Sequence, residues 1–261
     1  MIILPVVLLF LGWLLNTPDG LLGKADAVGY AVCHRIDARS FHLGDRAVPL
    51  CARCSGMYLG AMLGLAYQAF VSRRRGGMPP VRVILVLGLF VVAFGVDGVN
   101  SYLRLNVEMG LLSSAPTLYD PQNLLRLLTG TGMGLGIAAM IYPAFSQTVW
   151  ADWQPKPAIA GLRSLGMLIL LALFVDLLVL TENPLLLYPL ALVSAAGVLI
   201  LLTMVYSMVW MMLFRLENRY QALRQMILPL MGGFGLALLQ IVLLDLVRYV
   251  FTGSWDGFHL G

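Results

Sequence analysis

Residues 82–103 read RVILVLGLFVVAFGVDGVNSYL, an apolar stretch with a single acidic side chain, Asp97. A transmembrane helix needs about 20 predominantly apolar residues to cross the hydrocarbon core of a bilayer. This stretch therefore predicts a membrane-spanning helix. The same character predicts further helices near residues 1–16, 53–71, 124–149, 162–181, 185–213 and 227–251. The expected fold is an all-α, polytopic transmembrane helix bundle of about seven spans.

The composition supports a chain that is surrounded by lipid. Of its 261 residues, 60% are hydrophobic and 11% are charged, whereas soluble domains carry about 25% charged residues. The net charge of +4 is small and scattered, which argues against nucleic acid as a partner because that needs a dense basic surface. Membrane lipids are the expected surroundings. Neither a soluble domain nor a long linker is evident, so residues 1–261 are predicted to form one integral-membrane domain.

The distribution of basic residues predicts the orientation in the membrane. If the spans alternate, three loops on one side share nine of the 17 basic residues, namely Arg73, Arg74, Arg75, Arg82, Lys156, Arg163, Arg215, Arg219 and Arg224. The positive-inside rule places these loops in the cytoplasm. The N-terminus is then inside, and residues 17–54 are outside a bacterial or archaeal cell membrane. An Ala-x-Ala sequence at 25–27 leaves a cleaved signal peptide as an alternative to a retained first helix.

Residues 33–54 contain all three cysteines and two of the three histidines. Cys51-x-x-Cys54 has the spacing of a metal-binding knuckle, and a structural zinc site is completed by two more Cys or His ligands. Cys33 is the natural third ligand. Either His34 or His42 is the fourth, and geometry favours His42 because Cys33 and His34 are adjacent. The segment is expected to be an ordered Cys/His loop over 17–54 that binds zinc or another transition metal.

Other chemistries for the same thiols stay open. In an oxidising compartment two of the cysteines could form a disulfide or a redox pair, or all three could be buried and inert. Haem attachment is disfavoured because Ser55, and not a histidine, follows Cys54. A nucleotide cofactor is not expected, since the sequence has neither a phosphate loop nor a dinucleotide fingerprint.

Three carboxylates lie inside apolar spans: Asp97, Asp176 and Asp245. Each precedes the end of its span by five or six residues, so all three are expected at one depth, on the side of the cysteines. An unpaired carboxylate in a membrane is costly and marks a candidate functional site. Four arginines are expected at that level as partners, namely Arg53, Arg104, Arg126 and Arg248.

Two interpretations of these charges stay open. The first is a network of ion pairs that holds the bundle together. The second is a polar chamber under the Cys/His loop, where arginines hold a phosphate or carboxylate headgroup and an aspartate acts as a general base. Candidate catalytic residues are Asp97, Arg126, Asp176 and Asp245.

Small residues recur every four positions in two of the predicted helices. Gly56, Gly60 and Gly64 form one stripe, and Gly130 and Gly134 form another. Such stripes let helices approach closely in lipid. Close helix packing is the favoured interpretation, and room for a flat apolar ligand is the alternative.

Two sequence blocks resemble an uncharacterised membrane-protein family, domain of unknown function 2085. The first block comprises Cys33-His34, Arg39-Ser40-Phe41 and Pro49-x-Cys51-x-Arg53-Cys54-x-Gly56-x-Tyr58-x-Gly60. The second comprises Asp97, Asn100 and Asn123-Leu-Leu-Arg126-Leu-Leu-Thr129-Gly130. The similar region covers about residues 30–136.

The resemblance implies one shared site but no particular reaction. Its members would be Cys33, His34, Arg39, Ser40, Cys51, Arg53, Cys54, Asp97, Asn123 and Arg126. His42 lies outside the signature, so the resemblance favours His34 as the fourth ligand, against the spacing argument.

The hypothesis drawn from the sequence is a membrane protein whose Cys/His metal site caps an Asp/Arg chamber for a lipid-type or anionic substrate. The residues expected to contact that substrate are Arg39, Ser40, Arg53, Asn100, Arg104, Asn123 and Arg126. A thiol redox protein, and a transporter or structural subunit of a membrane complex, are the alternatives.

Overall fold

The computed structural model describes residues 2–71 and 73–255. Its α-helices are α1 (Ile3–Asn16), α2 (Gly20–Val32), α3 (Ala52–Val71), α4 (Val81–Glu108), α5 (Asn123–Val149), α6 (Leu162–Leu180), α7 (Pro184–Leu213) and α8 (Ile227–Thr252). Short 3-10 helices are η1 (Asp37–Arg39) and η2 (Leu223–Met226). The strands are β1 (His42–Leu43), β2 (Arg46–Ala47), β3 (Arg75–Gly77) and β4 (Gln154–Pro157).

The helix lengths confirm the predicted polytopic bundle. Within the described residues, six helices are long and apolar enough to cross a membrane, namely α3 to α7 and α8 with η2. Helices α1 and α2 meet at a bend of 107°, and by length and composition the pair is either a seventh, broken span or a re-entrant loop. Pro18 and Gly20 lie in this bend, and Gly20 has a φ of +78°.

One part of the predicted loop proves to be helical. Residues 20–32 form α2, whereas the sequence predicts a loop over all of 17–54. Hydropathy misses this helix because Lys24, Asp26 and its glycines lower its apolar character. The helix is nevertheless buried, since it packs against α7 and α8 and not against lipid.

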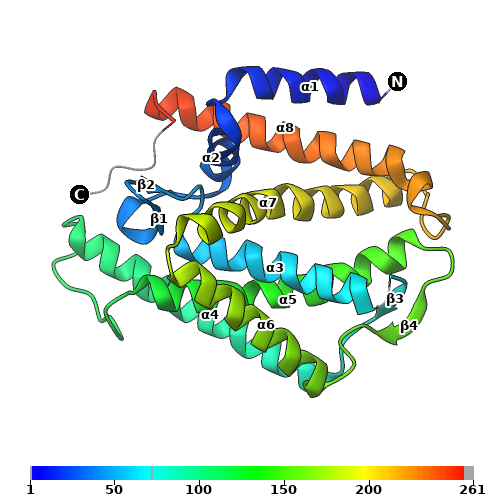
Figure 1. Cartoon of the computed structure of the whole chain (residues 1–261), viewed down its shortest axis with the longest axis horizontal. Coiled ribbons are helices and arrows are strands. Elements are labelled where there is room, and N and C mark those ends of the chain that lie inside the picture. The colour runs from blue at the N-terminus through cyan, green and yellow to red at the C-terminus, as the bar shows by residue number, and fades with distance from the viewer. Residues whose placement is uncertain (1, 72, 256–261) are drawn as a thin grey trace.

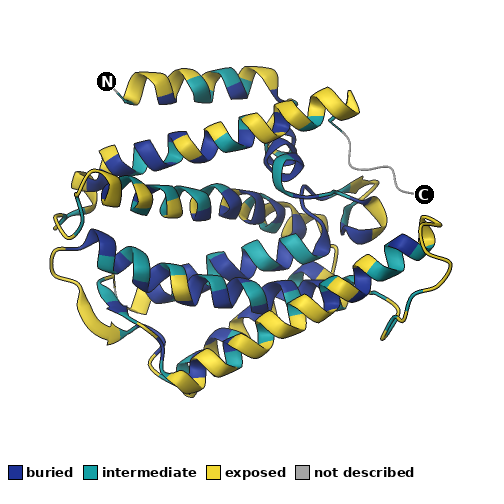
Figure 2. Ribbon diagram, turned by 180° about the vertical axis from the view of Figure 1, so that it is seen from behind, coloured by how far each residue is buried: buried dark blue, intermediate teal, exposed yellow. Residues whose placement is uncertain are grey.

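Helices α3 and α5 form the centre of the bundle (Figure 1). Helices α7 and α8 lie on one side of this pair, with α1 at the outer edge beside α8, and α4 and α6 lie on the other. Viewed from behind, α3 and α5 are largely buried, whereas α4 and α1 are largely exposed (Figure 2). The exposed side chains of α4 are mainly valine and leucine, as expected for a surface in contact with lipid.

Glycines allow the close approach of α3 and α5. A Cβ atom added at Gly56 would collide with the carbonyl oxygen of Leu127, and one added at Gly130 would collide with that of Arg53. The two glycine stripes therefore face each other, and backbone contact fills the space between them. Close helix packing, the favoured interpretation of the stripes, is confirmed.

The polar residues gather at one end of the bundle. Helices α2, α4, α6 and α8 end there, and α3, α5 and α7 begin there, with the β1–β2 hairpin among them (Figure 1). The parallel pair of β3 and β4 lies at the opposite end. This alternation brings the Cys/His segment to the same end as Asp97, Asp176 and Asp245.

Candidate metal and anion site

The two parts of the Cys/His segment meet where α2 ends and α3 begins. Cys33 directly follows α2, and its amide donates to the carbonyl of Gly29 at 2.8 Å. Cys51 directly precedes α3, and Cys54 lies in the first turn of that helix. A helix N-terminus stabilises negative charge, so the start of α3 would help to hold metal-bound thiolates.

The three thiols converge. The amide of Cys51 donates to Sγ of Cys33 at 3.4 Å, and side-chain hydrogen bonds join Cys33, Cys51 and Cys54 to one another. All three cysteines are free thiols. Ligand atoms of Cys33, His34 and Cys51 lie within 4.8 Å of one another. A tetrahedral zinc ion with ligands at about 2.3 Å holds its sulfurs about 3.8 Å apart, so only a small contraction is needed.

The hydrogen bonds divide negative charge unequally among the thiols. Bonds from Cys51 and Cys54 lower the pKa of Cys33 well below its usual value. The bond to Cys33 raises the pKa of Cys51 to about 12. One thiolate is therefore shared by three sulfurs. A bound metal ion would displace the remaining protons, since thiolates are the ligands of zinc.

His34, and not His42, lies with the thiols. Burial lowers the pKa of His34, although the nearby Cys33 opposes the effect, so the imidazole is kept neutral as a ligand requires. Its Nδ1 accepts a hydrogen bond of 3.1 Å from the amide of Ile36, and a metal ion bound at this nitrogen would replace that bond, since the ring proton is then on Nε2. His42 lies on β1, where its Nε2 is 3.1 Å from a carboxylate oxygen of Asp37. The geometry thus agrees with the resemblance and not with the spacing argument.

Two sets of polar contacts, which we call clamps, hold the Cys/His loop. Neither was predicted from the sequence. Asp26 of α2 pairs with Arg35 at 2.8 Å and also with Arg46 of the hairpin. Arg248 of α8 donates to the carbonyls of Tyr30 and Cys33, each at 2.6 Å. Arg248, expected among the partners of the intramembrane aspartates, directs these bonds to the end of α2. No short-range signal for Asp26 is present in the sequence, because Arg35 and Arg46 follow it only after 9 and 20 residues.

A buried ion pair lies next to the thiols. Arg53, between Cys51 and Cys54 in the sequence, donates through Nε to the carboxylate of Asp97 at 3.0 Å. Its Nη2 contacts the same carboxylate and also donates to Ser101 Oγ at 2.9 Å. Tyr119, which the sequence analysis did not select, donates to the other Asp97 oxygen at 2.8 Å. Burial and this bond raise the pKa of Tyr119 to about 12, so it stays a donor.

Two further arginines border this ion pair without a carboxylate of their own. Arg126 donates to Asn123 at 2.8 Å, and its buried Nε has no hydrogen-bond partner among the described residues. Arg39 makes one long bond, 3.4 Å, to the carbonyl of Ser101. Both are at most 9% exposed. Together with Arg53 they lie close enough to lower the pKa of His34, so the three arginines form one cluster beside the thiols, which we call the arginine chamber.

Three other candidate residues serve local structure. Ser40 donates to the carbonyl of Ile36 at 3.0 Å. Asn100 holds the segment after α4, because it accepts from the amide of Leu118 at 2.7 Å and donates to the carbonyl of Tyr119. Arg104 is partly exposed and bonds to Glu108 at 3.2 Å. The side-chain amide of Asn123 donates hydrogen bonds of 3.4 Å to the carbonyls of Ala38 and Ser40. Asn123 therefore joins the Cys/His loop to the arginine chamber.

The three intramembrane carboxylates do not meet. Asp176 accepts from Thr131 at 2.7 Å, and Asp245 lies between α8 and α1. Among the described residues, Asp97 alone of the three forms an ion pair. The expected assembly of four arginines and three aspartates is thus wrong. Each aspartate faces a different neighbouring helix, and 11, 4 and 7 residues separate Asp97, Asp176 and Asp245 from the ends of α4, α6 and α8.

The fold and the site define a polytopic helical membrane protein with a Cys/His cluster at one end of the bundle. The chain belongs to the family described as "Predicted membrane protein (DUF2085)", whose model matches residues 33–140. An uncharacterized protein of Methanocaldococcus jannaschii is 27% identical over 128 residues, which is 49% of this chain and 72% of that protein. An uncharacterized protein of Methanothermobacter thermautotrophicus is 30% identical over 109 residues, 42% of this chain and 83% of that protein. No solved structure matches this chain significantly.

The match confirms the resemblance seen in the sequence, and it covers the whole candidate site. Residues 33–140 include the three thiols, His34 and the arginine chamber. They leave out α6 to α8, including Asp176 and Asp245.

Proposed function

We propose that this membrane protein binds zinc or a similar transition metal ion through Cys33, His34, Cys51 and Cys54. The observation that carries the proposal is that ligand atoms of Cys33, His34 and Cys51 lie within 4.8 Å of one another. The Cys54 thiol is hydrogen-bonded to the other two thiols. Three sulfurs and a neutral imidazole are a donor set that zinc prefers. Arg248 and Asp26, which hold the loop, would supply the outer support that such sites need.

We further propose that the arginine chamber holds the anionic group of a lipid-type substrate beside the metal. Arg39, Arg53 and Arg126 contribute three positive charges, of which Asp97 neutralises that of Arg53, while Glu108 and the thiols act on the others only at a distance. Buried guanidinium groups without counter-ions are costly. A phosphate or carboxylate would offset that cost with bidentate bonds. Asp97 already binds Arg53, Tyr119 and Thr129, so positioning Arg53 suits it better than general base catalysis.

Metal analysis of the detergent-purified protein tests the first proposal. We expect one zinc or similar ion per chain and a loss of that metal in Cys51→Ser. His42→Ala is the matched control, because His42 lies outside the cluster. Wild-type protein without stoichiometric metal, or Cys51→Ser with full metal content, would contradict the site.

Anion binding tests the second proposal. Wild-type protein in phosphatidylcholine nanodiscs should bind a short alkyl phosphate, and Arg126→Gln should weaken that binding about tenfold, the loss of one charge-assisted contact. Arg163→Gln is the control, since Arg163 is exposed at the start of α6, at the opposite end of the bundle. Equal affinity of Arg126→Gln and the control variant for the alkyl phosphate would exclude the arginine chamber as the anion-binding site.

The thiols also allow a second function, because three hydrogen-bonded sulfurs in contact suit disulfide exchange. The two functions differ in the state of the purified protein. A metal site predicts alkylation of all three cysteines once a chelator is added, without reductant. A redox pair predicts alkylation of two cysteines only after reduction.

A further inference from the structure

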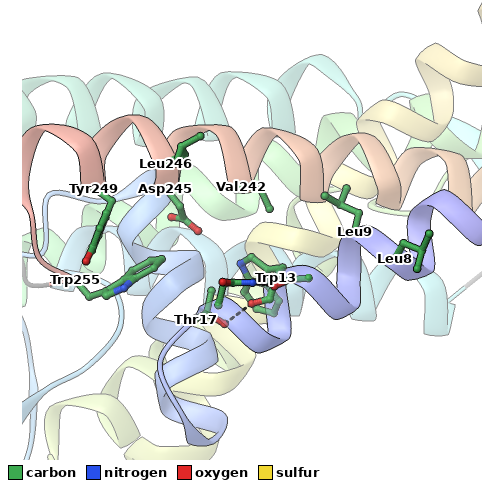
Figure 3. Close-up of a pocket in the computed structure, with 11 residues that line it drawn as sticks. Leu8, Leu9, Trp13, Thr17, Val242, Asp245, Leu246, Tyr249 and Trp255 are labelled. Atoms are coloured by element: carbon green, nitrogen blue, oxygen red, sulfur yellow. Dashed lines mark hydrogen bonds between the residues drawn. The ribbon is translucent and has the colours of Figure 1, made fainter.

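A second cavity lies between α1 and α8, away from the arginine chamber. It encloses about 630 Å³, which is within the range of small-molecule sites. Its apolar wall includes Leu8, Leu9, Val242 and Leu246. Figure 3 shows Asp245 pointing from α8 toward Trp13 of α1, with Tyr249 and Trp255 beside it. All of these residues lie outside the family match at 33–140.

Asp245 is a buried acid that lacks a counter-ion. The residue is 4% exposed, and neither carboxylate oxygen has a hydrogen-bond partner among the described residues. The indole of Trp13 faces it, but its Nε1 makes no hydrogen bond of normal geometry either. A carboxylate in this state is costly in an apolar environment unless a cation or donor reaches it.

The nearby cations are committed to other groups. Lys24 donates to the carbonyl and hydroxyl of Thr17 at 2.9 and 3.1 Å, and also to the carbonyl of Leu14. Arg248, one turn after Asp245, donates to the carbonyls that end α2. Its charge also acts on Asp245. Among the described residues neither carboxylate oxygen of Asp245 accepts a hydrogen bond, so both are available to a group from outside.

Aromatic side chains around the carboxylate indicate which cation would fit. Trp13, Tyr249 and Trp255 all line the cavity, and the rings of Tyr249 and Trp255 are 5.6 Å apart. Aromatic faces next to a carboxylate are the usual surroundings of an ammonium group, which gains cation–π attraction as well as charge pairing. The leucines and valine suit an alkyl chain attached to it.

We propose that the cavity between α1 and α8 binds an amphiphile with an alkyl chain and an ammonium head, with Asp245 as the counter-ion. The head reaches Asp245 when the Trp13 ring moves aside. Helix α1 permits this movement, because it lies at the edge of the bundle and packs mainly on α8 (Figure 1). The chain of the ligand would lie along Leu8, Leu9 and Leu246.

Equilibrium dialysis with radiolabelled dodecylammonium tests the proposal, with the protein in phosphatidylcholine nanodiscs and empty nanodiscs as background. We expect saturable binding of one ligand per chain and about tenfold weaker binding to Asp245→Asn, as expected when a charge-assisted contact is lost. Asp176→Asn is the matched control, since it removes another intramembrane carboxylate that lines a different cavity. Dodecanol has the same chain without the charge and should bind much more weakly.

Gly12→Leu keeps the test decisive if Asp245→Asn fails to fold. Gly12 lines the cavity, and a Cβ added there meets no atom within 4 Å. The leucine should fill the cavity and abolish binding while the carboxylate remains. Equal affinity for dodecanol, or wild-type affinity in both Asp245→Asn and Gly12→Leu, would overturn the proposal.

Two additional readouts define the ligand and separate the two sites. Competition by phosphatidylethanolamine in the nanodiscs would identify a lipid headgroup as the ammonium source, and its absence would identify a free amine. Metal content should be unchanged in Asp245→Asn and Gly12→Leu, because none of Cys33, His34 and Cys51 lines the cavity.

Discussion

The guanidinium of Arg53 binds both the carboxylate and the main-chain carbonyl of Asp97. Arg53 lies in the first turn of α3 between two of the thiols, and Asp97 lies in α4. This one ion pair therefore connects the metal site with the arginine chamber. A change in either partner is expected to affect both.

Asp97→Asn should destabilise the protein by about 3 kcal/mol, because it leaves a buried arginine without its counter-charge. Asp97 is fully buried, and the Arg53 side chain is 17% exposed. Reversible unfolding in detergent measures the effect. Asp120→Asn serves as the control, since the Asp120 side chain is 85% exposed. Equal stability of the two variants would show that Arg53 does not need Asp97.

His34→Ala should lower metal affinity strongly, whereas His42→Ala should leave it unchanged. The reason is position: His34 lies with the thiols, and His42 lies with Asp37. Titration with zinc against a competing chelator measures both affinities. The opposite ranking would identify His42 as the fourth ligand, as its spacing from Cys33 first indicated.

Arg248→Met should weaken metal binding by about 10- to 100-fold, the usual cost of removing outer support from a metal site. Arg248 contacts no thiol, but it holds the carbonyls of Cys33 and His34. Arg224→Met is a suitable control, because Arg224 is exposed in η2. Unchanged affinity in Arg248→Met would mean that the loop keeps its shape without this clamp.

Gly130→Val should prevent the close contact of α3 and α5 and lower the yield of folded protein. The added side chain would collide with the backbone at Arg53, which cannot move without disturbing the thiols. Gly88→Ala in α4 meets no atom within 4 Å and should be neutral or slightly stabilising, by up to about 1 kcal/mol. Size-exclusion profiles and thermal unfolding compare the two variants. A well-folded Gly130→Val protein would refute the backbone contact.

The sequence by itself determined the bundle and the three cysteines of the candidate metal site. Apolar stretches of about 20 residues can satisfy their backbone hydrogen bonds in lipid only as helices. Each span could therefore be predicted from its own stretch of sequence. Cys33, Cys51 and Cys54 were identifiable because thiols are rare in this chain and two have a knuckle spacing. Helix α2 was missed, since hydropathy reports contact with lipid and not burial against protein.

Only the tertiary structure decided which polar residues meet. The depth of Asp97, Asp176 and Asp245 follows from their positions along the chain, but the direction each one faces depends on how its helix is rotated against its neighbours. The same rotation brings Arg39 and Arg126 next to Arg53 and turns Arg248 toward the end of α2. Helix rotation is set by side-chain packing over many residues, such as the glycine contacts of α3 and α5, and no short motif records it.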